Sequence, residues 1–467
     1  MSAAPFAVLL RIDRAAARHT RHPRHLHPAL DLKYVQAGIA AKLGEHAPLL
    51  DGWLRPFDAA AFAAKALALH PRVAVIRAVT WCLDESVAVA AALRRAGVIT
   101  IAVGQQVQHI ARHPHPGWAE AYDLAVAGEP EEVLPQLLAQ LRDGAALTDL
   151  QQRWPAHGGS ALALVSQPDL LPAPVFAGHE LAAHPFPFPL RGTAPARWGY
   201  ALTAWGCPRP CRHCSAVVRK SVGRPLRTRP LAQVLDEVAR LADAGAQAIA
   251  FEDDSLFVHR GRLLALAEGL QQRHLTLPWL ANARPDELDE EVVAAARASG
   301  ARLLKIGVDS GAAHLIERIG KAPDGNAWLA ASRNAFALLD AQGIGAVALF
   351  MLGLPGETRA DAEATRALAL ELPADYLQVQ MYQPYPDVPG LGVLHDEQQP
   401  HADYHYAAHG AGMASSAELS ALQRNLYRRF YLRPSFIARH LRHGWRHYLN
   451  APALRLPGAL HFILGRN

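Results

Sequence analysis

Three of the four cysteines in this chain lie in the short stretch GCPRPCRHC. Cys207, Cys211 and Cys214 follow the spacing C-x3-C-x2-C, and Cys82 stands far from them. Three thiolates can hold a [4Fe–4S] cluster while leaving one iron open to another ligand. The main alternative is a zinc site with His213 as its fourth ligand. His213 and Cys214 are adjacent, however, and neighbouring side chains rarely point at one metal. Three unligated thiols are a third reading, disfavoured because the chain otherwise uses so little cysteine. The spacing therefore favours a cluster.

The composition is that of a folded α/β protein. Apolar residues make up 51% of the 467 residues and charged residues 19%, with 47 basic against 42 acidic side chains. This small excess forms no block of like charge, so it does not point specifically to nucleic acid or a membrane. Four cysteines are too few to stabilise a chain of this length through a disulfide framework, and this predicts a cytoplasmic location. No window approaches the ~18 apolar residues of a membrane span, and the first apolar run is interpreted as a strand.

Strand and helix patterns alternate in the first part of the chain, over 6–144. Short apolar runs at 6–12, 72–79, 98–104 and 122–128 predict strands, and stretches at 32–46, 85–97 and 129–144 have helical spacing. Such alternation predicts a parallel sheet with helices on both faces, whose ligands lie at the carboxyl ends of the strands. We expect residues 1–150 to form a Rossmann-like domain.

A second, longer alternation follows a proline-rich segment, 151–195, that is predicted to be an interdomain linker. Candidate strands lie at 198–205, 246–253, 277–283, 302–308, 343–352 and 374–382, and helical stretches near 230–243, 260–273, 288–299, 327–342 and 360–371 separate them. This pattern predicts a partial (β/α)6 barrel over 196–390, with a helical C-terminal tail over 391–467. Chemistry in such barrels lies on the loops after the strands, and the clustered cysteines follow the first strand.

The cysteine spacing in this context resembles the radical S-adenosylmethionine (SAM) superfamily, and the domain order resembles its cobalamin-binding-domain subgroup, which includes the bacteriochlorophyll cyclase and related methyltransferases. The resemblance covers most of the chain. It implies that Cys207, Cys211 and Cys214 hold a [4Fe–4S] cluster whose open iron binds SAM. Reductive cleavage of SAM then yields a 5′-deoxyadenosyl radical.

The resemblance assigns roles to residues at the strand ends. The segment FEDDSLF places Glu252, Asp253 and Asp254 near the methionine amine, and ANARPDEL offers Arg284 to the carboxylate. The remaining expected contacts are Asp309 and Ser310 to the ribose, Gly353 and Glu357 of FMLGLPGET at the adenine, and His213 where the family has an aromatic residue. A glutamate is usual at the position of Asp309, so its reach is shorter here.

For the first domain, the resemblance implies cobalamin bound near Gly104, Gly128 and Glu129. The motif D-x-H-x-x-G, whose histidine ligates cobalt, is absent. Gln105 replaces a common glycine, and Arg77 and Thr80 lie near positions that usually carry a small hydroxyl residue. A vestigial domain that binds no cobalamin is therefore the alternative.

The other histidines and Cys82 have simpler interpretations. His19, His22, His25 and His27 alternate with arginine and proline, which favours a solvated loop over a metal site. The group His109, His113 and His115 is interpreted in the same way. Cys82 follows a strand and is expected to be a small packing residue.

These features predict a radical SAM enzyme that methylates an unactivated carbon with the help of cobalamin. One alternative is a radical cyclisation or rearrangement, and another is a non-catalytic cobalamin- or partner-binding protein. The expected partners are a small-molecule, lipid or peptide substrate and an electron donor such as flavodoxin or ferredoxin, without nucleic acid or a membrane span. Trp279, Tyr382 and Tyr385 either line the substrate cleft or belong to the core. One cluster is all that the cysteines can supply.

Overall fold

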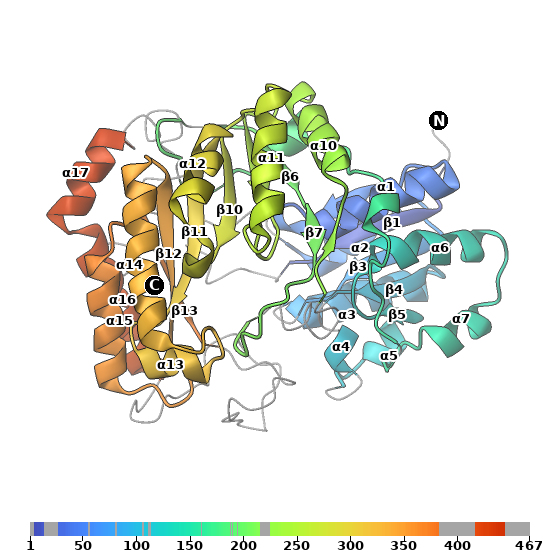
Figure 1. Ribbon diagram of the computed structural model, residues 1–467. Helices are drawn as coiled ribbons and strands as arrows, with labels where there is room; N and C mark the ends of the chain where they lie inside the picture. The colour runs from blue at the N-terminus through green and yellow to red at the C-terminus, as the bar shows by residue number, and fades with distance from the viewer. Residues whose placement is uncertain are drawn as a thin grey trace.

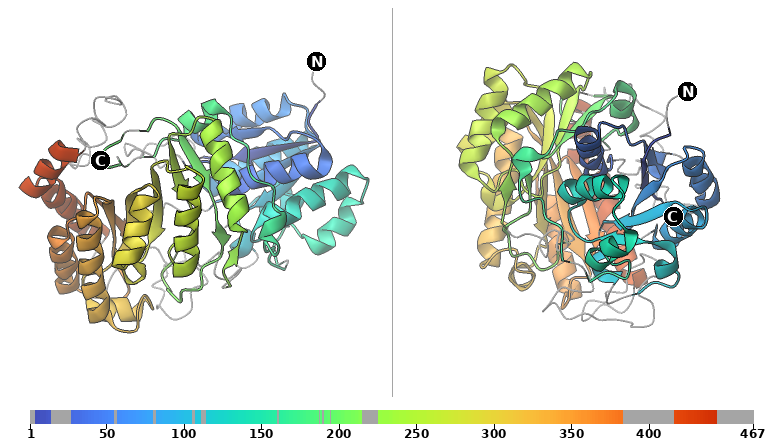
Figure 2. Two further views of the ribbon diagram at one scale, coloured as in Figure 1. Left: turned by 45° about the horizontal axis from the view of Figure 1, so that its top comes forward. Right: turned by 90° about the vertical axis from the view of Figure 1, so that its right-hand side faces the viewer.

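The computed structural model describes residues 4–13, 27–54, 57–79, 82–104, 107–110, 114–159, 161–186, 188, 190–193, 195–214, 225–382 and 416–443. Within these ranges the chain forms two parallel sheets of five and six strands and a small two-stranded antiparallel pair. The larger sheets lie side by side with helices against them (Figures 1 and 2). This arrangement confirms the expected α/β fold class.

The first sheet has the strand order β2-β1-β3-β4-β5. Its strands are β1 (Ala7–Arg11), β2 (Leu49–Asp51), β3 (Val73–Arg77), β4 (Ile99–Val103) and β5 (Leu124–Val126). The associated helices are α1 (Leu30–Leu43), η1 (Gly52–Leu54), α2 (Ala59–Leu67), α3 (Leu83–Arg95), α4 (Val107–Ile110), α5 (Trp118–Ala121), α6 (Pro130–Arg142) and α7 (Leu147–Arg153). Val8 and Leu10 of β1 join the core on the α2–α3 side, and Ala7 and Leu9 join the core on the α1–α6 side. Burial of both faces explains the continuous apolar runs.

The second sheet has the order β13-β12-β11-β10-β9-β6, the open arrangement of a partial barrel. Its strands are β6 (Trp198–Ala201), β9 (Ala248–Phe251), β10 (Trp279–Ala283), β11 (Ala301–Asp309), β12 (Gly345–Leu352) and β13 (Tyr376–Met381). The helices and 3-10 turn between them are α10 (Leu231–Asp243), α11 (Arg260–Gln272), η4 (Pro285–Glu287), α12 (Glu290–Ala298), α13 (Ala313–Arg318), α14 (Gly325–Ala341) and α15 (Arg359–Glu371). The five expected helices are present, and α13 is an addition that the sequence pattern did not predict.

The predicted strand 198–205 is wrong in one respect, because it is two strands. After β6 the backbone leaves the sheet, and β7 (Ala204–Trp205) pairs antiparallel with β8 (Arg227–Thr228). Asp253 holds the chain at this break: its carboxylate accepts hydrogen bonds from the backbone N–H of Thr203 at 3.0 Å and from the Thr203 hydroxyl at 2.7 Å. The segment between β7 and β8, residues 206–226, is called the cysteine loop below. It is described up to Cys214 and again from Pro225.

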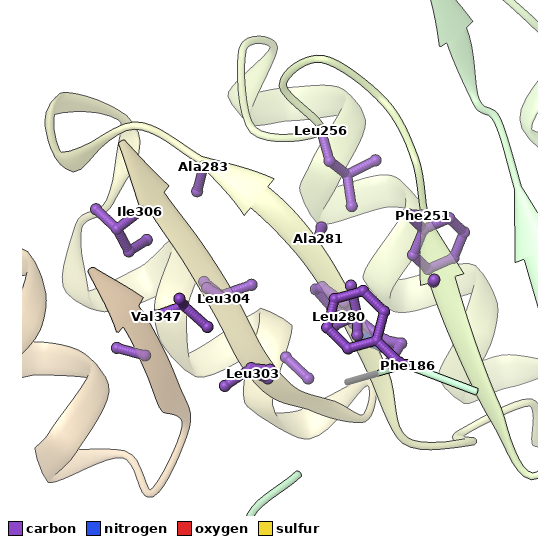
Figure 3. Close-up of a cluster of buried hydrophobic side chains, with 14 of the residues drawn as sticks. Phe186, Phe251, Leu256, Leu280, Ala281, Ala283, Leu303, Leu304, Ile306 and Val347 are labelled. Carbon is purple, nitrogen blue, oxygen red and sulfur yellow. The ribbon is translucent and has the colours of Figure 1, made fainter. Parts of the chain in front are cut away.

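The predicted linker contains short helical elements and contributes to the barrel core. It includes η3 (Pro168–Leu170) and α8 (Gly178–Ala183). Phe186, 1% exposed, belongs to the same apolar cluster as Phe251 and Leu280 (Figure 3). The domain boundaries remain predictions, since this segment packs as part of the barrel.

Two helices of the tail are described, α16 (Ser416–Tyr431) and α17 (Pro434–His443). Tyr427 and Tyr431 of α16 bond to the backbone of β13, so α16 covers the far edge of the barrel sheet. Figures 1 and 2 show α17 at the end of the molecule opposite the first domain. Among the described helices, none is both long and apolar enough to cross a membrane.

Candidate active site

The cysteine loop is fastened to the first domain at both of its ends. Trp205, which precedes the loop, donates its indole N–H to Glu131 Oε1 at 3.1 Å. Arg227, which follows the loop, donates two hydrogen bonds to the Glu129 carboxylate at 2.7 and 2.9 Å. Both glutamates lie at the start of α6. The antiparallel pair β7–β8 thus closes a loop whose base is held by two contacts to one helix end.

One of the three thiols, that of Cys211, lies beside two cationic side chains. Cys207 and Cys211 are buried, and Cys214 is half-buried. Arg284 directs Nη1 toward Cys211 Sγ at 3.4 Å. The side chain of Lys321 is 10% exposed; burial acts to lower its pKa, but Asp309 and, to a lesser degree, Cys211 raise this pKa above its usual value. Neighbouring positive charge stabilises thiolates, the form that binds iron. The donor set therefore fits an iron–sulfur cluster.

The described side chains do not distinguish a cluster from zinc by the grouping of the ligands. Within the described ranges, no three or more His, Cys, Asp or Glu side chains are grouped so that they could hold a metal ion, and this finding includes the three cysteines. His213 instead directs Nε2 toward Asp309 Oδ2 at 3.4 Å. Its contact is with a carboxylate, whereas a cluster needs only the thiolates.

Asp309 is the centre of a buried charged group beside the loop. Lys321 Nζ lies 2.7 Å from Asp309 Oδ2, on the same oxygen that His213 approaches. Burial acts to raise the pKa of the Asp309 carboxyl, but Lys321 and His213 outweigh it and hold this pKa below its usual range. Asp309 also has a φ of 71°, a left-handed conformation that Asp tolerates better than most residues. The structure thus brings together His213 and Asp309, which the resemblance places at the adenine and the ribose.

Arg284 is fixed by neighbours on three sides. Its guanidinium makes a two-point contact with Asp286 at 2.9 and 2.8 Å and donates to the Lys321 carbonyl at 2.8 Å. The guanidinium carbon also lies 4.7 Å from the centre of the Trp328 ring. These contacts hold Nη1 in place beside Cys211. Its expected role at the carboxylate of SAM stays a prediction.

The three acidic residues after β9 point to different partners. Asp253 is buried, and this burial raises its pKa to about 6, although the hydrogen bonds from Thr203 act to lower it. Glu252 Oε1 lies 3.2 Å from His27 Nδ1, and Asp254 is half-buried. Asp253 therefore shapes the strand end, while contact of these residues with the methionine amine stays a prediction.

The residues predicted for the adenine and ribose help to build the turns on which they lie. Gly353 has a φ of 78°, and its N–H donates a short hydrogen bond to Glu357. Burial raises the pKa of Glu357 to about 7. Ser310 is fully buried, and its hydroxyl accepts a hydrogen bond from the Ala312 N–H. Their assignment to SAM stays a prediction.

The residues predicted for cobalamin are partly covered by the chain itself. A Cβ on Gly128 would lie 2.3 Å from the Ala163 carbonyl oxygen, and Glu129 is occupied by Arg227 and by the Val165 N–H at 2.8 Å. Gly104 has a φ of 106°, which favours glycine whatever is bound. Gly128 and Glu129 are thus engaged within the protein, and their assignment to cobalamin stays a prediction.

Several residues at the site carried no sequence signal. Lys321 and Trp328 lie more than ten positions after the end of β11, and the residues next to them in the sequence form no recognisable motif. Only the fold brings them near the cysteine loop. In the sequence, Glu131 is one of several acidic residues at the start of a helix and does not stand out. In the structure, burial raises its pKa to about 7. No local spacing could have revealed these residues.

Two histidine interpretations need correction. His27 does not lie in a solvated loop, because it packs edge-on against Phe186 and Tyr200 and approaches Glu252. His115 has a side chain only 10% exposed and lies 2.6 Å from Asp84.

Other sequence expectations are settled in part. Cys82 is a packing residue as expected, fully buried, and burial raises its thiol pKa. Trp279 and Tyr382 are buried in apolar clusters, which favours the core interpretation. Seven residues named in the sequence analysis lie outside the described part of the chain: His19, His22, His25, Thr80, Gln105, His113 and Tyr385. The side chain of His109 also lies outside it.

Comparison with known proteins agrees with this geometry. Residues 204–369, from β7 through most of α15, match the family model of the Radical SAM superfamily. The match covers this part of the chain, and it confirms the resemblance to the radical SAM superfamily that the sequence led us to expect.

Two curated relatives each match about two fifths of this chain. An uncharacterised methyltransferase of Pyrococcus horikoshii is 29% identical over 40% of this chain and 40% of its own length. The anaerobic magnesium-protoporphyrin IX monomethyl ester cyclase of Rubrivivax gelatinosus is 28% identical over 39% of this chain and 32% of its own length. The chain thus matches less than half of the length of either relative.

Solved structures extend the likeness to the first domain. The radical SAM methyltransferase TsrM from Kitasatospora setae, described with cobalamin and a [4Fe–4S] cluster bound, has a TM-score of 0.62 and covers 82% of this chain and 77% of its own. The cobalamin-dependent SAM radical enzyme OxsB has a TM-score of 0.61 and covers 81% of this chain and 53% of its own. At 17% identity for each, these similarities establish the shared fold.

Proposed function

We propose that this chain is a radical SAM enzyme that uses one [4Fe–4S] cluster on Cys207, Cys211 and Cys214, and that it methylates an unactivated carbon with the help of cobalamin. The observation that carries the proposal is the grouping of Cys211, the cations Arg284 and Lys321, and the His213–Asp309 pair at the carboxyl edge of the barrel, on and beside the loop that also carries Cys207 and Cys214. When bound, the cluster would supply the electron that cleaves the sulfonium of SAM.

The chain's own residues would bind SAM and the cluster and hold them in position. Asp309, kept ionised by Lys321 and His213, is an acceptor suited to ribose hydroxyls. Arg284 and Lys321 give the site a positive field on the thiolate side, which stabilises a cluster of net negative charge. Burial of these groups excludes water, which strengthens each of these interactions.

The cobalamin part of the proposal rests on the fold of the first domain and on the printed descriptions of TsrM and OxsB. Because Gly128 and Glu129 are engaged by Ala163 and Arg227, we assign them no role in holding the corrin. That leaves the edge formed by the ends of β1, β3 and β4 as the proposed binding surface.

The test is a reconstitution of the full chain, purified without oxygen, with iron, sulfide and hydroxocobalamin. About four irons per chain, about one corrin, and release of 5′-deoxyadenosine from SAM on reduction are expected. Fewer than about one iron would contradict the cluster, and iron without corrin would contradict the methylation proposal alone. The substrate class, whether small molecule, lipid or peptide, and the electron donor, such as flavodoxin or ferredoxin, are left open by this experiment.

A radical cyclisation or rearrangement without cobalamin is the second candidate. The specific observation in its favour is the covered position of Gly128 and Glu129. In that case the first domain would act as an anchor for the cysteine loop. Iron and 5′-deoxyadenosine without bound corrin would select this candidate.

A further inference from the structure

The tail helix α17 is amphipathic in an unusual orientation. Its exposed residues Pro434, Ile437, Ala438 and Leu441 follow the spacing i, i+3, i+4, i+7 and so form one apolar stripe on the solvent side. Ile437 is 46% exposed and Leu441 66% exposed. Helices on a protein surface ordinarily turn such a stripe inward. We call these four residues the α17 stripe.

Polar and aromatic contacts hold the opposite side of α17 to the protein. Arg433 donates to the carbonyls of Leu370 and Ala374 at 2.9 Å each, and Arg439 pairs with Asp340. Phe436 packs edge-on against Tyr431 with ring centres 5.0 Å apart. The orientation of the helix is therefore fixed by its inward side, and the exposed stripe is a consequence of specific contacts.

The charged residues of the sequence that follows Glu418 have one sign. After Glu418 the sequence contains no Asp, Glu or Lys up to residue 467. It contains the arginines Arg424, Arg428, Arg429, Arg433, Arg439, Arg442, Arg446, Arg455 and Arg466. Arg428 and Arg429 of α16 are exposed. The near-neutral balance of the whole chain conceals this concentration, because acidic residues elsewhere offset it.

We propose that α17 and the basic end of α16 form a docking surface for an anionic lipid membrane. An exposed apolar stripe in a segment of the sequence that is rich in arginine and contains no acidic residue matches the two requirements of interfacial binding, insertion of apolar side chains and attraction to anionic headgroups. The charge complementarity selects this occupant over a second copy of the chain, since two such surfaces repel each other. This surface lies away from the cysteine loop, so the inference is independent of the proposed function.

The experiment uses the full-length protein and flotation with vesicles of phosphatidylcholine, or of phosphatidylcholine in which part is replaced by phosphatidylglycerol. We expect at least about tenfold more binding to the anionic vesicles, and loss of that difference at high ionic strength. The variant Ile437→Glu/Leu441→Glu should lose binding at least about tenfold. Arg428→Glu/Arg429→Glu should weaken it by a similar factor.

The matched control is Val175→Glu, which places a charge on an apolar side chain that is 75% exposed and outside the tail. It should bind as the unmodified protein does. A circular dichroism spectrum checks that each variant is folded, and because the altered side chains are exposed, folding should be unaffected.

Three results would overturn the proposal. The first is absence of binding to anionic vesicles, and the second is binding that the stripe variant leaves unchanged. The third is a dimer in light scattering that Ile437→Glu/Leu441→Glu separates, which would assign the stripe to a second copy of the chain.

Discussion

The carboxyl edges of the two parallel sheets hold different kinds of polar residues. At the barrel edge, the Cys211 thiol, the Asp309 carboxylate and the cations Arg284 and Lys321 lie close together. At the edge of the first domain, the polar groups are paired with the protein itself: Arg11 with Asp51 at 3.1 Å and Arg77 with Asp31 at 2.8 Å. The described polar groups thus form a mixed cluster beside a thiol at one edge and closed ion pairs at the other.

This difference shows that sheet topology alone does not locate chemistry. Both sheets place loops at their carboxyl ends, where ligands of such folds bind. In the first domain Glu129 at that edge is bonded to Arg227 of the barrel. The function of each edge therefore depends on the side chains that lie there and not on the fold of the sheet.

The largest expected effect is a difference in iron content between a variant of a cysteine at the barrel edge and a variant of the cysteine in the first domain. Cys211→Ser should reduce the iron content of the reconstituted protein from about four per chain to less than one, because a thiolate ligand is lost. Cys82→Ser is the matched control, since Cys82 is buried in the first domain. It should keep the iron and lose only thermal stability. Equal iron content in both variants would remove the distinction between the edges.

The second test asks whether Glu129 serves the interface or a ligand. Arg227→Met leaves the buried Glu129 carboxylate without its two-point partner and should lower the free energy of unfolding by about 3 kcal/mol. Arg333→Met, which breaks the exposed pair with Glu371, should cost less than about 1 kcal/mol. Chemical denaturation of both variants measures the contrast. A small cost for Arg227→Met, together with a loss of bound corrin, would instead assign Glu129 to the cofactor.

The third test uses the pH dependence of stability. Burial raises the pKa of Glu131 from 4.5 to about 7, so between these values the folded state binds more protons than the unfolded state. Stability therefore falls as pH rises through this window and levels off above about 7. Glu131→Gln keeps an acceptor for Trp205 but no titrating group. It should be more stable than the unmodified protein at pH 8 by on the order of 2 kcal/mol.

At pH 4 the two proteins should differ little in stability, because Glu131 is then protonated in both the folded and the unfolded chain. Other buried carboxyls, such as Glu357, are common to both proteins and cancel in the comparison. Parallel curves of unfolding free energy against pH would show that Glu131 titrates normally.

The smallest expected effect lies within the barrel edge. Arg284→Gln removes a charged donor from Cys211, which should make the reduction potential of the cluster more negative. A charge-assisted hydrogen bond of about 1.4 kcal/mol corresponds to a shift of about 60 mV for one electron. Arg284→Lys keeps the charge and should shift less. Potentiometric titration followed by electron paramagnetic resonance measures both, and an unchanged potential would exclude Arg284 from this role.

The sequence predicted much of the fold and less of the site. Apolar periodicity located the barrel strands and five of its helices, because those patterns reflect burial of local segments. The spacing of the cysteines indicated the cluster for the same local reason. The break after β6 was not predictable, since it depends on Asp253, fifty positions from Thr203.

The same limit applies to the residues that surround the thiols. Lys321 joins Asp309 and Cys211 through the fold, and Glu131 joins Trp205 from another domain. Neither has a periodic pattern or a motif spacing. The inward side of α17 also depends on distant partners, as in the pairing of Arg439 with Asp340, so periodicity gave the helix but not the direction of its apolar stripe.

The two-point attachment of the cysteine loop to α6 has a consequence for biogenesis. The ribosome completes the first domain before it synthesises Trp205 and Arg227, and domains commonly fold in that order during synthesis. Glu129 and Glu131 are thus already in place as a template when the three thiols emerge. Iron insertion during maturation therefore takes place on a loop whose two ends have been anchored beforehand by an earlier part of the same chain.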